Sequence, residues 1–225
     1  MAGRLAAEWI GLGETPEPLP FRFVLAAALH DLAWADADRE ARWDESASGP
    51  FAFGTVNDDY REPLYRAGID TLESIDDYAA LLKSLHYARF LPDRPAFVSF
   101  EEARRARILD RLPAAHADPA TIERHRSLLI FFDFLSLFCL LTGPGAVEPA
   151  EWLTADRVGR TPSGESFSLR WQGPAELRLA PFPFARSFRL AVPARHLPLT
   201  FGTEADLAAA WASAPAATVE VRLGP

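Results

Sequence analysis

The longest apolar stretch of the chain spans residues 127–141, and only one carboxylate, Asp133, interrupts it. A helix that is apolar on all sides must be buried on most of its surface, so we expect Asp133 inside the protein. A buried carboxylate is costly unless it is paired, bound to a metal or protonated. The stretch is shorter than the ~20 apolar residues that a bilayer requires, and it carries a charge near its centre. It therefore predicts the central helix of a globular domain.

Before and within this stretch, apolar residues recur at the spacing of amphipathic helices. Asp118 and Pro119 are typical of a helix start, and Ser99 with Glu102 matches a capping box. Residues 35–61 carry acidic and aromatic side chains and turn signals, which is typical of a long structured loop that acts as a lid. The expected helices cover residues 2–12, 21–34, 63–72, 75–90, 99–112 and 120–141.

After Gly145 the period changes to two, and apolar residues alternate with polar ones in four short segments. Such segments predict strands with one buried face, paired in an antiparallel sheet. One helix, capped at Thr203, interrupts them. We expect an α+β protein in which a helical body (residues 1–145) and a small antiparallel β layer (residues 146–225) pack into one compact unit. The aromatic face of the sheet could cover the helices or a second subunit, so a homo-oligomer stays open.

Composition and charge narrow the classes of partner. The 225 residues carry a formal net charge of −8, which argues against nucleic acid or an anionic membrane as the main partner. The single cysteine, Cys139, excludes an intramolecular disulfide and a cysteine-rich zinc site. The N-terminus lacks the pattern of a signal peptide, and a cytoplasmic location is the expectation.

Four residues on three expected helices have side chains that can ligate a metal: His30, Asp31, His86 and Asp133. Imidazoles combined with carboxylates suit zinc, manganese or iron. Such a site leaves positions open for water, which becomes a nucleophile near neutral pH, and this predicts hydrolytic chemistry. The alternative is structural: His86 as a core histidine, and Asp133 in an ion pair with an arginine or with His30.

Several short motifs, in this order and spacing, resemble an uncharacterised and mostly bacterial domain-of-unknown-function family, numbered 3891. The resemblance covers nearly the whole chain and implies no established activity. The motifs are His-Asp-Leu-Ala-Trp at residues 30–34, Asp44 with Ser-Gly-Pro-Phe at 48–51, and residues 78–86, 132–137 and 180–184.

The His-Asp pair followed by a lone aspartate on a later helix also resembles the HD metal-dependent phosphohydrolases. His30, Asp31 and Asp133 correspond to the last three metal ligands of that pattern, and His86 to an extra histidine of some members. The resemblance implies an HD-like helical body and a small, phosphate-containing substrate. Asp31 and Arg89 are the expected catalytic residues, and Arg89 would contact the phosphate from one turn beyond His86. The alternative is a non-catalytic small-molecule-binding or interaction protein that has lost the metal.

The pattern departs from that superfamily in one place, because no histidine precedes His30. The helix expected from residue 2 also lacks a capping side chain in Ala2 or Gly3. One cause would explain both features: the chain as given begins inside its first helix. We therefore expect upstream in-frame codons that encode a capped turn with a histidine.

Overall fold

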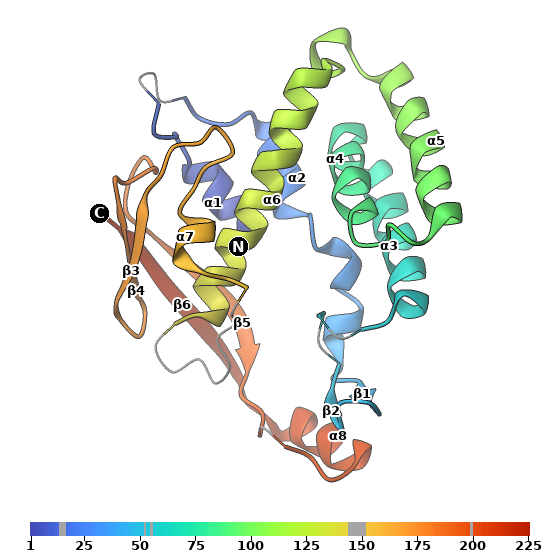
Figure 1. Ribbon diagram of the computed structural model, residues 1–225. Helices are drawn as coiled ribbons and strands as arrows, with labels where there is room; N and C mark the ends of the chain where they lie inside the picture. Colours follow the sequence, from blue (N-terminus) through green and yellow to red (C-terminus); the bar gives the residue numbers. More distant parts are fainter. Residues whose placement is uncertain (14–16, 52, 55, 144–151, 199) are drawn as a thin grey trace.

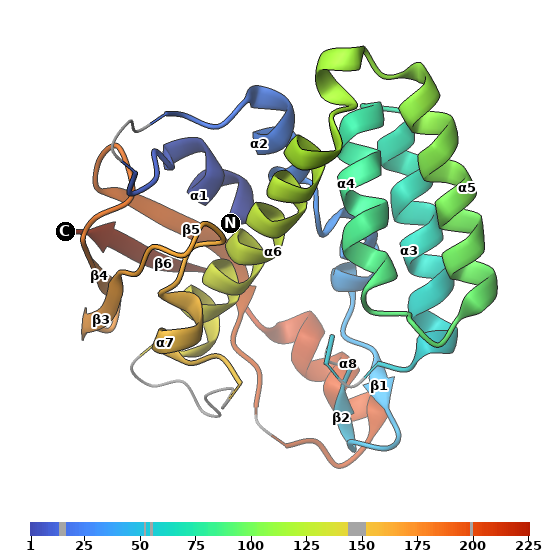
Figure 2. The same cartoon turned by 45° about the horizontal axis from the view of Figure 1, so that its top comes forward.

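A long helix, α6 (Pro119–Leu141), runs through the middle of the molecule and separates a group of helices from a sheet (Figure 1). The computed structural model describes residues 1–13, 17–51, 53–54, 56–143, 152–198 and 200–225. On one side of α6 lie α3, α4 and α5, and on the other side lie α1 and the sheet (Figure 2). The apolar surface of α6 is explained by this place between two layers.

The helices of the described part follow the expected order, except that the short helix α7 was not expected. Their bounds are α1 (Ala2–Glu8), α2 (Phe21–Ala28), α3 (Asp58–Glu73), α4 (Asp77–Ala88), α5 (Pro95–Arg111), α6, α7 (Ala155–Val158) and α8 (Glu204–Ser213). Short 3-10 helices occupy Leu32–Trp34 (η1), Ala37–Arg39 (η2) and Ala114–His116 (η3). As expected, Asp118 caps α6 by accepting a hydrogen bond from the main-chain N–H of Thr121 at 2.8 Å.

Four expected boundaries were wrong by more than two residues. The helix expected over residues 2–12 ends at Glu8, because the main chain is already extended at Trp9. The helix expected over residues 21–34 ends at Ala28, so the His-Asp pair lies in a turn after it. Helix α3 begins before Pro63, because the Asn57 side chain caps it by accepting from the N–H of Tyr60. The capping box at Ser99 does not form, because α5 already starts at Pro95, whose fixed φ suits the first turn.

The main sheet contains β3 (Ser168–Gly173), β4 (Glu176–Ala180), β5 (Phe188–Arg195) and β6 (Ala216–Gly224), in the order β3-β4-β6-β5. The β3–β4 and β5–β6 pairs are antiparallel, whereas β4 and β6 are parallel. The expectation of a purely antiparallel sheet was therefore wrong. The reason is topological: β6 enters between β4 and β5, which run in opposite directions, and must be parallel to one of them. A second, two-stranded sheet pairs β1 (Trp43–Asp44) with β2 (Gly49–Pro50) inside the expected lid.

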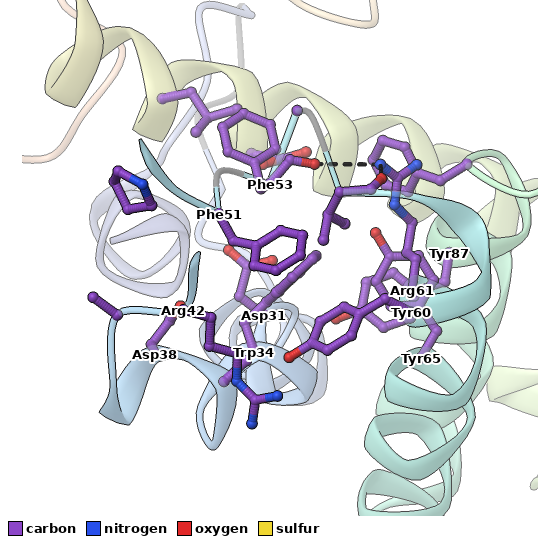
Figure 3. Close-up of a pocket in the computed structure, with 18 of the residues that line it drawn as sticks. Asp31, Trp34, Asp38, Arg42, Phe51, Phe53, Tyr60, Arg61, Tyr65 and Tyr87 are labelled. Atoms are coloured by element: carbon purple, nitrogen blue, oxygen red, sulfur yellow. Dashed lines mark hydrogen bonds between the residues drawn. The ribbon is translucent and has the colours of Figure 1, made fainter. Parts of the chain in front are cut away.

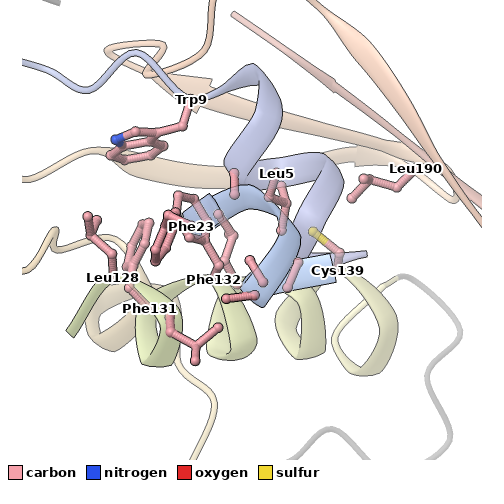
Figure 4. Close-up of a cluster of buried hydrophobic side chains, with 14 of the residues drawn as sticks. Leu5, Trp9, Phe23, Leu128, Phe131, Phe132, Cys139 and Leu190 are labelled. Carbon is pink, nitrogen blue, oxygen red and sulfur yellow. The ribbon is translucent and has the colours of Figure 1, made fainter. Parts of the chain in front are cut away.

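One apolar core joins the helices to the sheet. Trp9, just after α1, makes edge-on ring contacts with Phe131 and Phe132 of α6 and with Phe184, at centroid distances of 5.2, 5.4 and 5.5 Å. Phe23 of α2 lies against Phe132 in the same cluster (Figure 4). Edge-to-face packing of this kind adds to the stabilisation from burial. The α+β class is confirmed, and the boundary expected at residues 145 and 146 lies outside the described residues.

Candidate functional site

The His-Asp pair lies in the turn between α2 and η1, and helix α4 holds this turn from the side. The hydroxyl of Tyr87 donates to the carbonyl of His30 at 2.9 Å, and the ammonium of Lys83 donates to the carbonyl of Leu29 at 3.0 Å. Both side chains are almost fully buried. Nδ1 of His30 bonds to the carbonyl of Ala27 at 2.9 Å. The turn is thus fixed by contacts with the main chain rather than by helical continuation.

The structure brings together all four of the residues predicted as metal ligands. Nε2 of His30 lies 3.0 Å from Oδ2 of Asp31 and 3.6 Å from Oδ1 of Asp133. Nε2 of His86 lies 3.6 Å from Oδ2 of Asp133. Arg89 donates to the same Asp133 oxygen at 3.1 Å, so the expected phosphate contact is already an ion-pair partner of Asp133. We call this group the acid–histidine cluster: His30, Asp31, His86, Arg89 and Asp133.

The two histidines of the cluster differ in charge. Burial alone would lower the pKa of His30, but the neighbouring carboxylates of Asp133 and Asp31 outweigh it and raise that pKa to about 9. Burial, together with the positive charges of Arg89 and His30, holds the pKa of His86 well below its usual value. At neutral pH the cluster therefore contains an imidazolium between two carboxylates, and a neutral imidazole beside it.

The geometry of the cluster bears on whether it can bind a metal ion. In the residues that the structure describes, no group of three or more histidine, cysteine, aspartate or glutamate side chains is arranged to hold a metal ion. Two features of the cluster nevertheless suit a cation. Nδ1 of His30 is bonded to a carbonyl, which directs Nε2 towards the carboxylates, and that Nε2 makes no hydrogen bond of good geometry. The metal thus stays a prediction.

Four members of the cluster, Asp31, His86, Arg89 and Asp133, line a cavity of about 1050 Å³, whereas His30 is not among its lining residues. We call the part of the cavity formed by these four residues its floor. Many aromatic and arginine side chains also line the cavity. Asp31, whose side chain keeps 60% of its surface exposed, lies among aromatic rings in this cavity (Figure 3). Aromatic residues that line it include Trp34, Phe51, Phe53, Tyr60, Tyr65, Tyr87, Phe90, Phe134, Trp152 and Trp211. Its arginines are Arg42, Arg61, Arg89, Arg157 and Arg195. The volume suits a small organic molecule.

Part of this lining was foreseen and part was not. Residues of the loop expected as a lid line the cavity, and so does Trp34; the role of a lid stays a prediction. Sequence reasoning missed Tyr65, although it follows Arg61 by four residues on one face of α3, a spacing that marks a shared surface. It also missed Arg195 and Trp211, for which the local sequence carries no signal, because they reach the cavity only through the tertiary fold.

Other titratable candidates lie elsewhere. His125 is buried, and its Nδ1 bonds to the hydroxyl of Tyr78 at 2.6 Å. Burial lowers the pKa of His125 to about 4, so it is a neutral core residue. Burial also raises the pKa of the Cys139 thiol to about 12, so that cysteine is a small apolar side chain of the core.

Comparison with known proteins gives one match. The family model described as "Protein of unknown function (DUF3891)" covers residues 1–199. The chain belongs to the DUF3891 family. No curated protein and no solved structure matches it, and nothing in these comparisons connects DUF3891 with the HD phosphohydrolases. Helix α8 and strand β6 of this DUF3891 protein lie beyond the matched region.

One further property is common to the described helices of the protein. None of them combines the length with the apolar character that a bilayer-crossing helix needs. This agrees with the expectation that α6, despite its apolar sequence, is a core helix: Asp133 lies near its middle within the acid–histidine cluster.

Proposed function

We propose that this protein is a hydrolase of small phosphate-containing molecules, in which His30, Asp31, His86 and Asp133 hold a divalent cation at the floor of the cavity. The observation that supports it is the convergence of two imidazoles and two carboxylates, from separate elements, at the bottom of a cavity of substrate size. Clusters of titratable groups with shifted pKa values in a cleft are typical of functional sites.

The charge balance of the cluster favours a cation. Two carboxylates hold a proton on His30 against the effect of burial, so the site stabilises positive charge at Nε2. A divalent ion would place positive charge at the same position, and the Nε2 proton would be released as the ion binds. Ligands about 2.0–2.2 Å from an ion lie roughly 3.0–3.5 Å from one another. The separations of 3.0 and 3.6 Å in the cluster lie near that range.

The chain's own residues have separable roles in this proposal. A bound divalent ion would lower the pKa of water and so supply a nucleophile at neutral pH. The Asp31 carboxylate, exposed to the cavity, would accept the proton that the attacking water loses. Arg89 uses one N–H to bind Asp133, and its guanidinium has further donors for a phosphate oxygen. Asp31 and Arg89 are thus the proposed catalytic residues.

A second function is favoured by a different observation. His30 in its charged form and Arg89 neutralise the two carboxylates without a metal. In that case the cluster is the polar floor of a non-catalytic binding pocket, and the protein binds a small molecule and releases it unchanged. Only the metal separates the two functions, because the cavity is common to both.

The deciding experiment is a metal titration. Metal-free protein is titrated calorimetrically with Mn²⁺, Zn²⁺ and Fe²⁺, and the metal content of freshly purified protein is measured. The proposal expects one ion per chain, and a loss of affinity of at least tenfold in Asp133→Asn, since removal of one ligand charge weakens the site. Asp93→Asn, on an exposed turn, is the matched control. The same samples are assayed with p-nitrophenyl phosphate and bis(p-nitrophenyl) phosphate.

Each result decides between the functions. Stoichiometric binding that Asp133→Asn weakens, together with metal-dependent hydrolysis, supports the hydrolase. Absence of binding by all three ions, with no hydrolysis, contradicts it and leaves the binding pocket as the function. Equal weakening by the two variants would place the metal outside the cluster and contradict the assignment of ligands.

A further inference from the structure

Residues from the C-terminal part of the chain line part of the cavity. Arg195, the last residue of β5, and Trp211 of α8 line the same cavity as His86 and Asp133. In both views α8 lies beside β1 and β2, away from β3 and β4 of the main sheet (Figures 1 and 2). The indole N–H of Trp211 donates to the carbonyl of Arg39 at 3.2 Å. This hydrogen bond connects α8 to the loop of residues 35–61, which lines the cavity.

Arg195 and Trp211 form one unit. The guanidinium carbon of Arg195 lies 5.2 Å from the centre of the Trp211 ring, and the guanidinium also donates to the carbonyl of Ala214. Across the described ranges of the chain, Arg195 forms no ion pair with a carboxylate. Its charge is oriented by an aromatic face and a main-chain acceptor, and it remains available to an anion. We call this pair the distal clamp.

The loop offers a similar arrangement. The Arg42 guanidinium lies 5.5 Å from the centre of the Tyr60 ring, and Tyr60 stacks on Phe51 at 5.7 Å with an interplanar angle of 11°. Phe51 and Phe53 keep 37% and 50% of their surface exposed where they line the cavity. These two rings therefore present apolar faces to the cavity. We call the part of the cavity formed by this loop and by the distal clamp the upper cavity. It combines cations with flat apolar faces.

The floor and the upper cavity suit different chemical groups of a ligand. The floor carries the carboxylates of Asp31 and Asp133 together with His86 and Arg89. In the rest of the cavity, among the described residues, Arg42, Arg157 and Arg195 form no ion pair with a carboxylate, whereas Arg61 pairs with Asp58 at 3.5 Å, and Asp38 and Glu40 also line the cavity. A phosphate ion would fill a small share of about 1050 Å³. A molecule that occupies both ends needs an aromatic body between two anionic groups.

We infer that the distal clamp determines ligand selectivity, with Trp211 stacking on a flat ring of the ligand and Arg195 binding an anionic group at the end remote from Asp133. The inference rests on the small-molecule cavity of the proposed function, and it requires neither metal nor hydrolysis. Trp211 lies beyond the region that the DUF3891 family model covers. Arg195, the other member of the distal clamp, lies within that region.

The test compares three probes by calorimetry with metal removed by a chelator: inorganic phosphate, 2-naphthyl phosphate and 6-carboxy-2-naphthyl phosphate. Wild-type protein should bind 2-naphthyl phosphate at least tenfold more tightly than phosphate, and the added carboxylate should give about a further tenfold, in keeping with a charge-assisted hydrogen bond. Arg195→Ala should abolish the gain from the carboxylate, and Arg195→Lys should restore part of it. Arg189→Ala, an exposed arginine of the same strand, is the matched control and should keep the full gain.

Trp211 is tested in the same series. Trp211→Ala should weaken both naphthyl probes about tenfold and leave phosphate binding unchanged, since base-like rings gain this much from aromatic stacking. Trp211→Phe keeps a ring and should recover most of the affinity, which a purely structural role of the indole N–H would not explain. Circular dichroism melts confirm that each variant is folded.

The outcomes separate this inference from the proposed function. Wild-type protein that prefers neither naphthyl probe to phosphate, or equal losses in Arg195→Ala and Arg189→Ala, would overturn the distal clamp. The protein could show the expected preference for the naphthyl probes but bind no metal and hydrolyse no substrate. That result would overturn the proposed hydrolase alone. The protein could also hydrolyse both naphthyl probes. If Arg195→Ala then leaves the ratio of their kcat/KM values unchanged, the distal clamp alone would be overturned.

Discussion

The hydroxyl of Tyr87 donates a hydrogen bond to the main-chain carbonyl of His30 at 2.9 Å, across 57 residues of sequence. This bond ties the turn that carries the His-Asp pair to the helix that carries His86. The geometry of the acid–histidine cluster thus depends on a contact that involves neither a carboxylate nor a ring nitrogen.

We expect Tyr87→Phe to lower the free energy of unfolding by about 1–2 kcal/mol, because it leaves the buried His30 carbonyl without its donor. Urea denaturation followed by circular dichroism measures the loss. Tyr60→Phe is the control, since Tyr60 lines the open cavity and its hydroxyl has no hydrogen bond among the described residues. Losses of the same size in both variants would contradict the role given to the Tyr87 hydroxyl.

The ionisation of His30 gives a second prediction. Burial opposes the charged form, but Asp133 and Asp31 raise the pKa of His30 to about 9. Titration of the ring by NMR in metal-free protein should show this value, and Asp133→Asn should lower it, because one of the two carboxylates is lost. A His30 pKa at or below 6.5 in the wild-type protein would contradict the arrangement.

The same shift has a consequence for stability. The folded-state pKa of His30 lies above the unfolded value, so its contribution is complete below about pH 6.5 and is lost as the pH rises through about 9. Burial lowers the pKa of Lys83 to about 7, despite the nearby Asp31 carboxylate. The unfolded state then binds more protons at Lys83 between about pH 7 and 10.5, so this group makes stability rise with pH. The two slopes oppose each other.

A third prediction follows from these opposed slopes. Lys83→Met removes the rising contribution, so its stability should fall between pH 7 and 9 by up to roughly 1.4 kcal/mol per pH unit relative to the wild-type protein. Unfolding free energies measured at several pH values give the slopes. Arg105→Met, a half-buried cation of α5 that bonds to Ser84 and not to the turn, is the control. Parallel pH profiles of Lys83→Met and the wild-type protein would exclude this account of Lys83.

Much of this site was accessible from the sequence, because it depends on residues whose surroundings are unusual. Asp133 interrupts an apolar helix, and His86 follows the apolar Leu82 by four residues on α4; both side chains are buried and therefore require partners. The spacing of apolar residues also predicted α6 and its cap. These features follow from local patterns, which a sequence records directly.

The remaining features depend on contacts between distant parts of the chain. The His-Asp pair left its expected helix because Lys83 and Tyr87 bind the carbonyls of the turn, which no pattern in residues 21–34 records. The parallel β4–β6 pairing arises from the order in which strands join the sheet. Trp211 enters the cavity by bonding to Arg39, 172 residues away. Hydrophobic periodicity identifies elements, whereas these contacts decide how the elements meet.

The last prediction concerns the side of the turn opposite α4. Gly68 of α3 lies so close to η1 that a Cβ placed on it would be 2.5 Å from the Cβ of Ala33 and 2.8 Å from its Cα. Gly68→Ala must therefore displace η1, and with it the adjacent His-Asp turn. Overpacking of this kind costs about 1–3 kcal/mol. Gly173→Ala is the control, because no heavy atom lies within 4 Å of the Cβ it would add.

The double variant Gly68→Ala with Ala33→Gly makes this prediction specific to the contact. Ala33→Gly removes the Cβ that meets the new methyl group, although the Cα remains close, so it should restore part of the lost stability despite the helix propensity that glycine lacks. The NMR signals of the His30 ring should shift in Gly68→Ala and return towards their wild-type positions in the double variant. Additive losses in the double variant, with no return of the His30 signals, would show that α3 does not position the turn through Gly68.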